Sequence, residues 1–182
     1  MSRTEIFEQI RSVHRQILGR IASLEAGVLH SGARPGRRNA GSRNAEVREF
    51  IEILKQQFLA HTILEDEVLY PALVEALPQT KATIDPLHAE NLELRNMATR
   101  LASTLEEEPG PARDEQIAVQ MRDLVDLLRI HLRKEEALVL GVAERVLKPS
   151  EIDAMKQRMQ TRSHVESTQR PSPGRTMKGS LE

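Results

Sequence analysis

One short pattern, His-x-x-x-Glu, occurs twice in this chain, and both copies interrupt long apolar stripes. The first copy is His61 with Glu65, and the second is His131 with Glu135. Side chains four residues apart lie on the same face of an α-helix. Each pair therefore directs an imidazole and a carboxylate into one space, on the face that its helix buries. This requirement restricts the fold more than any other feature of the sequence.

Apolar residues recur in steps of three and four along four segments, which predicts four amphipathic helices. These helices are expected over residues 4–29, 45–76, 85–105 and 114–146. The Gly-, Pro- and Arg-rich residues 31–43 and the Pro-Gly-Pro turn within 106–113 predict the connections between them. The inner faces are expected to carry, in chain order, Ile10, Ile17, Ile21, Leu24 and Val28; Val47, Ile51, Leu54, Phe58, His61, Glu65, Val68 and Ala72; Leu87, Asn91, Leu94, Ala98 and Leu101; Ile117, Met121, Leu124, Leu128, His131, Glu135, Leu138 and Val142.

Four such helices predict an all-α fold, an up-down-up-down four-helix bundle over residues 1–148. A short fifth helix is expected over 149–163, followed by a disordered tail over 164–182. Asp85 and Pro86 are typical of a helix start, and Pro71 is expected to kink the second helix. Aromatic residues make up only 2% of the chain, so the core should be aliphatic.

Charge and cysteine content exclude several function classes. The 26 basic and 27 acidic residues are intermixed, so no strong field attracts nucleic acid or an anionic membrane. The absence of cysteine excludes disulfides, thiolate metal sites and a cysteine nucleophile. No apolar run has the length of a membrane span or the character of a secretory signal. We therefore expect a soluble, cytoplasmic protein that binds neither nucleic acid nor membrane.

Histidines on all four expected helices extend the pattern. His14 fills the one gap in the first apolar stripe, and counting from the connecting loops places it level with His61. His88, near the start of the third helix, should likewise be level with His131. Together with Glu65 and Glu135, these residues form a candidate metal site. Nitrogen and carboxylate ligands without sulfur suit iron, manganese or zinc. The alternative is a metal-free interaction protein, in which the six residues are joined by hydrogen bonds alone.

The order of these elements resembles the hemerythrin-like family of HHE cation-binding domains. The resemblance rests on His14, His-Thr-Ile-Leu-Glu with Asp-Glu-Val-Leu-Tyr-Pro at 61–71, His88, and His-Leu-Arg-Lys-Glu-Glu at 131–136. It covers roughly residues 5–147. It implies two non-haem iron ions with Glu65 and Glu135 as bridges, the four histidines as terminal ligands, and an oxo or hydroxo bridge between the ions.

One departure from the family's oxygen carriers stands on the third helix. Those proteins place a second histidine four residues after the first, where this chain has Leu92. Asn91 is close by and is expected to donate a hydrogen bond to a ligand. About 12 coordination positions surround two six-coordinate ions, and the predicted ligands fill about eight. The resemblance therefore implies an open centre.

Two functions follow from that expectation. The preferred one is a di-iron module that binds oxygen or nitric oxide, or senses iron or oxygen status through a protein partner that the sequence does not identify. The alternative is a di-iron enzyme that reduces oxygen, peroxide or nitric oxide, or an iron donor for repair. Tyr70, Asp66, Glu67 and Glu136 are candidates for moving protons, although charged residues beside a helix seam are usually only solvated.

Overall fold

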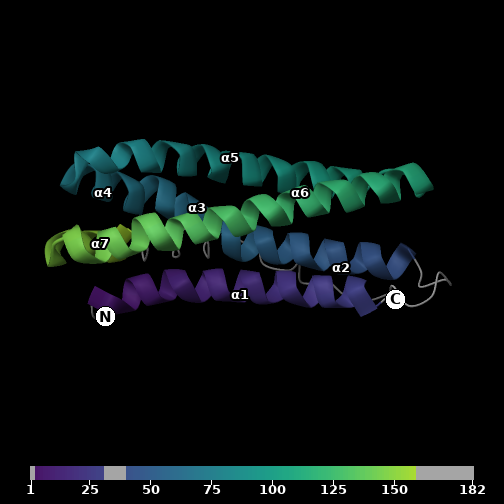
Figure 1. Ribbon diagram of the computed structural model, residues 1–182, viewed down its shortest axis with the longest axis horizontal. Helices are drawn as coiled ribbons and strands as arrows, with labels where there is room; N and C mark the ends of the chain where they lie inside the picture. The colour runs from purple at the N-terminus through teal and green to yellow at the C-terminus, as the bar shows by residue number, and fades with distance from the viewer. Residues whose placement is uncertain (1–2, 31–39, 159–182) are drawn as a thin grey trace, which may run out of the picture.

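The computed structural model describes residues 3–30 and 40–158, and within them it contains helices and no β-strand. Four long helices run alternately up and down, side by side (Figure 1). The predicted all-α four-helix bundle is therefore confirmed. In chain order the helical segments are α1 (Arg3–His30), α2 (Ala40–Ile53), α3 (Ala60–Leu64), α4 (Tyr70–Ala76), α5 (Lys81–Thr104), α6 (Pro111–Glu135) and α7 (Gly141–Val146). Residues 149–158 form the start of the expected fifth helix, while the expected tail lies outside the described residues.

Two of the four long helices are interrupted by π-helical turns. In the second, the turns Leu54–Leu59 and Glu65–Leu69 join α2, α3 and α4 into one continuous helix. In the fourth, the turn Glu136–Leu140 joins α6 to α7. A π turn pairs residue i with residue i+5, so it adds one residue to the turn and rotates every later side chain. Each His-x-x-x-Glu pair is followed by such a turn.

That rotation corrects two of the predicted inner faces. Leu138, predicted to face inward, is 50% exposed, and the buried positions after Glu135 are Val139, Leu140 and Ala143. The second helix shows the same shift of one residue, because Leu73 is fully buried and the predicted Ala72 is only partly so. The inner face predicted for α5 is confirmed at all five of its positions.

The predicted start of the third helix is also wrong. Helix α5 begins at Lys81, and Pro86 lies inside it rather than at its first position. A short 3-10 turn, Pro78–Thr80, precedes it, and Thr80 Oγ1 donates to the carbonyl of Leu77 at 2.7 Å. Pro78 thus supplies the helix-start signal that the sequence analysis assigned to Pro86.

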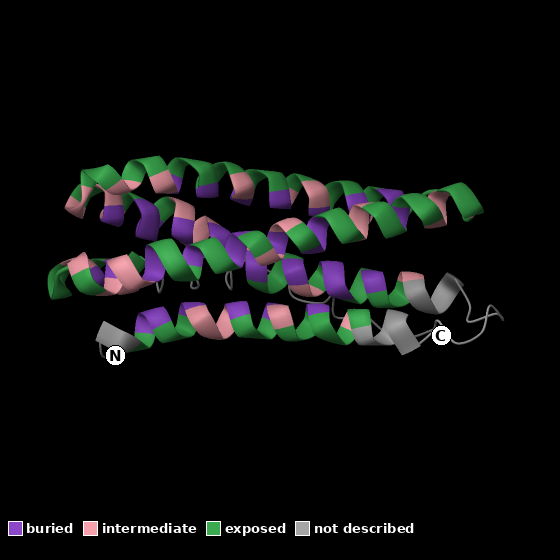
Figure 2. Cartoon of the chain, viewed as in Figure 1, coloured by how far each residue is buried: buried purple, intermediate pink, exposed green. Residues whose placement is uncertain are grey.

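The buried faces point toward the bundle axis along its whole length (Figure 2). Their apolar side chains form two clusters rather than one. The first contains Phe58, Leu94, Leu124 and Leu128, and the second contains Phe7, Leu69, Leu87 and Leu140. Between them the inner faces of α1, α3 and α6 carry polar residues. This polar layer is the candidate metal centre.

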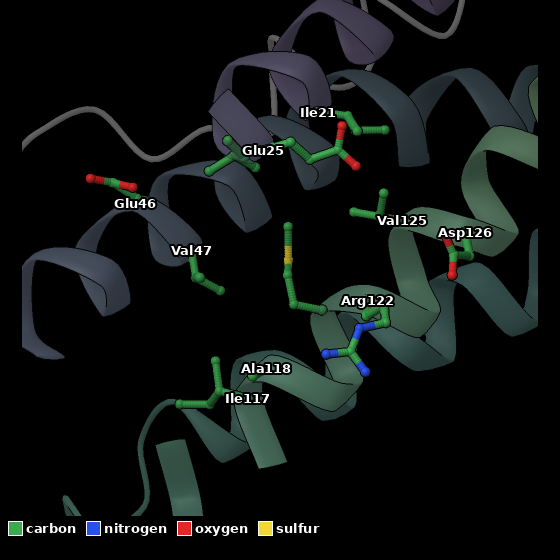
Figure 3. Close-up of a pocket in the computed structure, with 11 residues that line it drawn as sticks. Ile21, Glu25, Glu46, Val47, Ile117, Ala118, Arg122, Val125 and Asp126 are labelled. Atoms are coloured by element: carbon green, nitrogen blue, oxygen red, sulfur yellow. The ribbon is translucent and has the colours of Figure 1, made fainter. Parts of the chain in front are cut away.

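None of the described helices combines the length and hydropathy that crossing a bilayer requires. An open apolar cavity of about 590 Å³ lies elsewhere, between α1, α2 and α6 (Figure 3). Ile21, Val47 and Val125 point into it, and Glu25, Arg122 and Asp126 stand at its edge. It contains none of the predicted ligands.

Candidate metal centre

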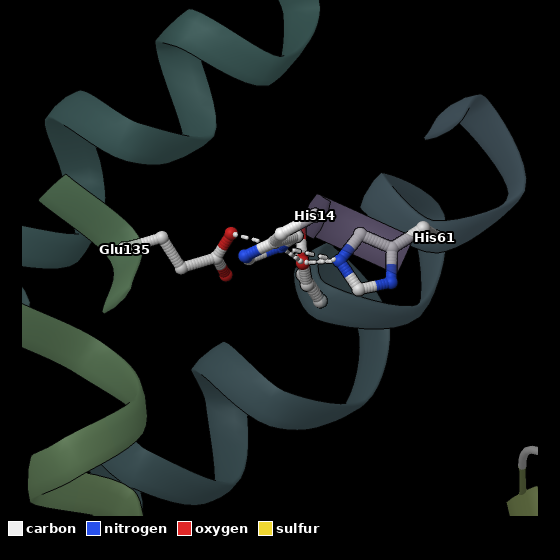
Figure 4. A group of neighbouring side chains, drawn as sticks. His14, His61 and Glu135 are labelled. Carbon is white, nitrogen blue, oxygen red and sulfur yellow. Dashed lines mark hydrogen bonds and ion pairs between the residues drawn. The ribbon is translucent and has the colours of Figure 1, made fainter. Parts of the chain in front are cut away.

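Four side chains from three of the long helices converge in the polar layer. One ligand atom from each lies within 4.8 Å of the others, and all four residues are buried: His14, His61, Glu65 and Glu135. His14 lies between the other two labelled side chains in Figure 4, with Glu135 on one side and His61 on the other. The level predicted for His14 and His61 is confirmed, because their Nε2 atoms are 2.9 Å apart.

The helices position these groups in the way the spacing predicted. His61 and Glu65 are four residues apart on one face, and His61 Nε2 contacts Glu65 Oε1 directly. His14 reaches across from α1, with Nε2 at 3.8 Å from Glu65 and 3.4 Å from Glu135. His131, fully buried on α6, places Nε2 at 3.8 Å from Glu135 Oε2. Two imidazoles, those of His14 and His131, therefore approach Glu135 Oε2.

Glu65 and Glu135 form ion pairs with His61 and His14, but these contacts leave several buried polar atoms without a hydrogen bond of normal geometry. Glu65 Oε1, Glu65 Oε2, Glu135 Oε2 and His131 Nε2 are all buried, and none has a hydrogen-bond partner in the described part of the chain. A buried polar atom without a partner costs roughly 1–3 kcal/mol. Carboxylate and imidazole lone pairs that converge in a buried layer are what a cation requires. The donor set therefore fits a metal ion better than a hydrogen-bonded network.

In the metal-free chain, protons on the buried side chains compensate the negative charge of the carboxylates. Burial opposes protonation of His14, but Glu135 and Glu65 outweigh it and raise the pKa of the ring to about 9. Burial likewise works to raise the pKa of Glu65, yet His61 and His14 hold it well below its usual range. Burial and the charge of Glu65 together raise the pKa of Glu135. Protons thus occupy the positions that a cation would take.

A second ring of contacts orients the ligands. His14 Nδ1 lies 3.4 Å from Glu136 Oε1, and His131 Nδ1 lies 3.2 Å from Glu90 Oε2. Each of these histidines can donate its Nδ1 proton to a carboxylate and keep the Nε2 lone pair for a metal. Burial lowers the pKa of His131, which favours that neutral form.

Tyr70 belongs to this ring, a role that the helix period did not predict. It is 2% exposed, and its hydroxyl donates to Glu135 Oε1 at 3.1 Å. Burial and the charges of Glu65 and Glu135 raise the pKa of the phenol, so it stays protonated and acts as a donor. Tyr70 follows Glu65 by five residues, which is the separation that a π turn brings into line.

His88 is the predicted ligand that the structure does not bring to the cluster. Its side chain is 60% exposed, and its Nδ1 lies 2.9 Å from Asp66 Oδ1. Asp66 also accepts from Asn91 Nδ2 at 3.0 Å and from Arg95 at 2.9 Å. The residue of α5 that faces the bundle interior at this height is Asn91, which is fully buried.

The family model of the hemerythrin HHE cation-binding domain matches residues 5–143. The chain belongs to this family. The match spans the four clustered residues and His131, so the buried His/Glu cluster lies within the cation-binding HHE domain. Comparison of this HHE domain with curated proteins and with solved structures gave no match.

Replacing Tyr70 with phenylalanine tests how this HHE domain orients its ligands. The change should lower the free energy of unfolding of the metal-free protein by roughly 1–3 kcal/mol, because Glu135 Oε1 loses its donor. It should also weaken metal binding by about tenfold, the usual loss when a ligand's hydrogen-bond partner is removed. Thermal unfolding and a competition titration with a chelator measure the two effects. Unchanged values in both would show that the hydrogen bond does not orient Glu135.

Proposed function

We propose that this chain is a non-haem di-iron module that binds oxygen or nitric oxide, or senses iron or oxygen status. The observation that carries the proposal is the convergence of His14, His61, Glu65 and Glu135 within 4.8 Å in a buried layer. His131, whose Nε2 lies 3.8 Å from the same Glu135 oxygen that His14 approaches, supplies a further nitrogen that a second ion would need. Glu65 and Glu135 would bridge the two ions.

The burial of the metal-binding side chains favours a small ligand over a bulky substrate. Among the five residues of the centre, His61 is the most exposed at 7%, and the others are at 0%. A large reactant would have to open the bundle, whereas a diatomic gas is smaller than the side chains around it. When bound, iron supplies open coordination positions and reversible one-electron chemistry. The protein contributes the ligands, their orientation and the exclusion of bulk water.

A metal assay tests the proposal directly. Protein expressed with ample iron should contain close to two iron ions per chain, and its visible spectrum should change on exposure to oxygen or nitric oxide. A protein that purifies without stoichiometric iron and does not take it up when reconstituted anaerobically would contradict the proposal. The metal-free interaction protein would then be the better reading.

The alternative function is an enzyme that uses the same centre to reduce oxygen, peroxide or nitric oxide, or a donor of iron for repair. The observation that favours catalysis is Tyr70, whose hydroxyl hydrogen-bonds to a proposed bridging carboxylate and could relay a proton to it. Turnover separates the two functions. Consumption of many equivalents of peroxide or nitric oxide per centre would favour the enzyme, while one stable spectral change without turnover would favour the binding module. Release of the iron to an acceptor protein would favour the donor.

A further inference from the structure

The inner face of α5 presents a single polar side chain to the centre, and it is an amide. Asn91 is fully buried between Leu87 and Leu94. Contacts with the two neighbouring helices show where Asn91 lies along the bundle axis. Its Nδ2 donates to Asp66, the residue after Glu65, and its neighbour Glu90 binds His131 Nδ1. Asn91 therefore lies at the level of the metal centre, between the helix that carries Glu65 and the helix that carries His131.

The orientation of the Asn91 amide follows from its partner. The Asp66 carboxylate accepts hydrogen bonds, so the amide nitrogen must face it and the oxygen must point elsewhere. Asp66 is itself held by Arg95 at 2.9 Å and by His88 at 2.9 Å. The remaining atom, Asn91 Oδ1, is buried and has no hydrogen-bond partner among the described residues. The Asn91 amide oxygen is therefore held in place and is available to accept a hydrogen bond or to bind a cation.

We propose that Asn91 Oδ1, and not His88, is the ligand that the third long helix contributes to the second of the two metal ions. It would act beside His131 Nε2, Glu65 Oε2 and Glu135 Oε2, which are also buried without a hydrogen-bond partner in the described part of the chain. This inference rests on the proposed dinuclear centre and refines it. His88 stays on the surface as a donor to Asp66, where it helps to fix the carboxylate that orients Asn91.

The two ions would then sit in unlike surroundings. The first takes two imidazoles, from His14 and His61, whereas the second takes one imidazole and an amide oxygen. The second ion therefore has one imidazole fewer, and a neutral amide oxygen donates electron density to a divalent ion less strongly than an imidazole nitrogen does. We therefore expect the chain to load in two steps, with the second ion bound more weakly and exchanged more readily than the first.

Titration of the metal-free full-length chain with Mn²⁺ alone tests this inference, with free Mn²⁺ followed by electron paramagnetic resonance. The wild type should bind two ions in two phases. Asn91→Leu keeps the volume of the side chain and should bind one ion, with the affinity of the first phase unchanged and that of the second lowered at least about tenfold. Asn91→Ala serves as the second variant if packing in Asn91→Leu is disturbed, and circular dichroism of the metal-free proteins verifies folding.

Two matched variants separate ligation from support of Asp66. Arg95→Leu removes another donor from the same carboxylate, and His88→Ala removes the competing candidate ligand. Both should still bind two ions. The inference is overturned if both Asn91 variants keep two ions, or if His88→Ala falls to one. Failure of the wild type to bind any metal would instead refute the proposed function.

Discussion

Replacing Glu65 with alanine should remove bound iron and destabilise the protein at the same time. In the metal-free chain Glu65 is a buried carboxylate held between His61 and His14. Removal of one partner from a buried charged pair costs about 3 kcal/mol or more, because the remaining charge is left uncompensated. Iron content per chain and thermal unfolding measure the result. The rise in melting temperature that metal should give the wild type should be absent from this variant.

A matched control for this variant is Glu52→Ala on the same helix. Glu52 has a 60% exposed side chain and pairs with Lys55 at 3.2 Å. An exposed pair of this kind contributes a few tenths of a kcal/mol, so iron content and stability should both stay close to the wild type. A Glu65→Ala protein with unchanged iron content would show that this carboxylate does not bind the metal.

Replacing the whole polar layer with apolar side chains should have the opposite effect on stability. Buried ionic groups exchanged for well-packed hydrophobic residues of similar volume often leave a protein about 1–4 kcal/mol more stable. Here the exchange would also join the two apolar clusters, which the polar layer now separates. The variant should unfold at a higher temperature than the metal-free wild type and bind no iron. Its substitutions are His14→Leu, His61→Leu, Glu65→Met, Tyr70→Phe, His131→Leu and Glu135→Met.

The informative comparison for this multiple variant is the wild type stripped of metal by a chelator, with denaturant unfolding of both. A variant less stable than the stripped wild type would mean that the polar layer already supports the fold without a cation. A more stable variant that binds no iron would mean that these residues are kept for metal binding at a cost in stability.

The sequence predicted the helices and the heart of the centre because those features depend on local period. Residues on an uninterrupted stretch of α-helix keep their face, so the spacing of His61 with Glu65 and of His131 with Glu135 needs no further information. The level of His14 with His61 depends on chain lengths either side of one connection. The prediction that these two histidines lie at the same level is confirmed by the contact between their rings.

The errors occur where the period changes. A π turn follows Glu65 and another follows Glu135, and the wrongly predicted positions Ala72 and Leu138 lie beyond the first turn and within the second. Leu138 was consequently placed inside, and Tyr70 was treated as a flanking residue. A π turn forms only when tertiary contacts compensate for its poorer geometry, and those contacts are not visible in a hydropathy pattern.

His88 was misplaced for a different reason. His88 lies on the exposed face of α5, and Asp66 on the second long helix contacts Asn91 and Arg95 of α5. The level of the centre then falls on Asn91. Asn91 interrupts an aliphatic stripe in the sequence, and that stripe correctly predicted that its side chain faces the bundle interior.

The spread of the ligands along the chain bears on how the protein is assembled. His14 lies near the beginning, His61 and Glu65 in the middle, and Glu135 near the end of the matched domain. Helical bundles owe their rapid folding to short-range contacts, whereas these ligands meet only after the three long helices that carry them have docked. A newly made chain therefore has at most one His-Glu pair to offer a passing ion, and tight capture must wait until synthesis has passed residue 135. Iron uptake would in this way be restricted to molecules whose folding is complete.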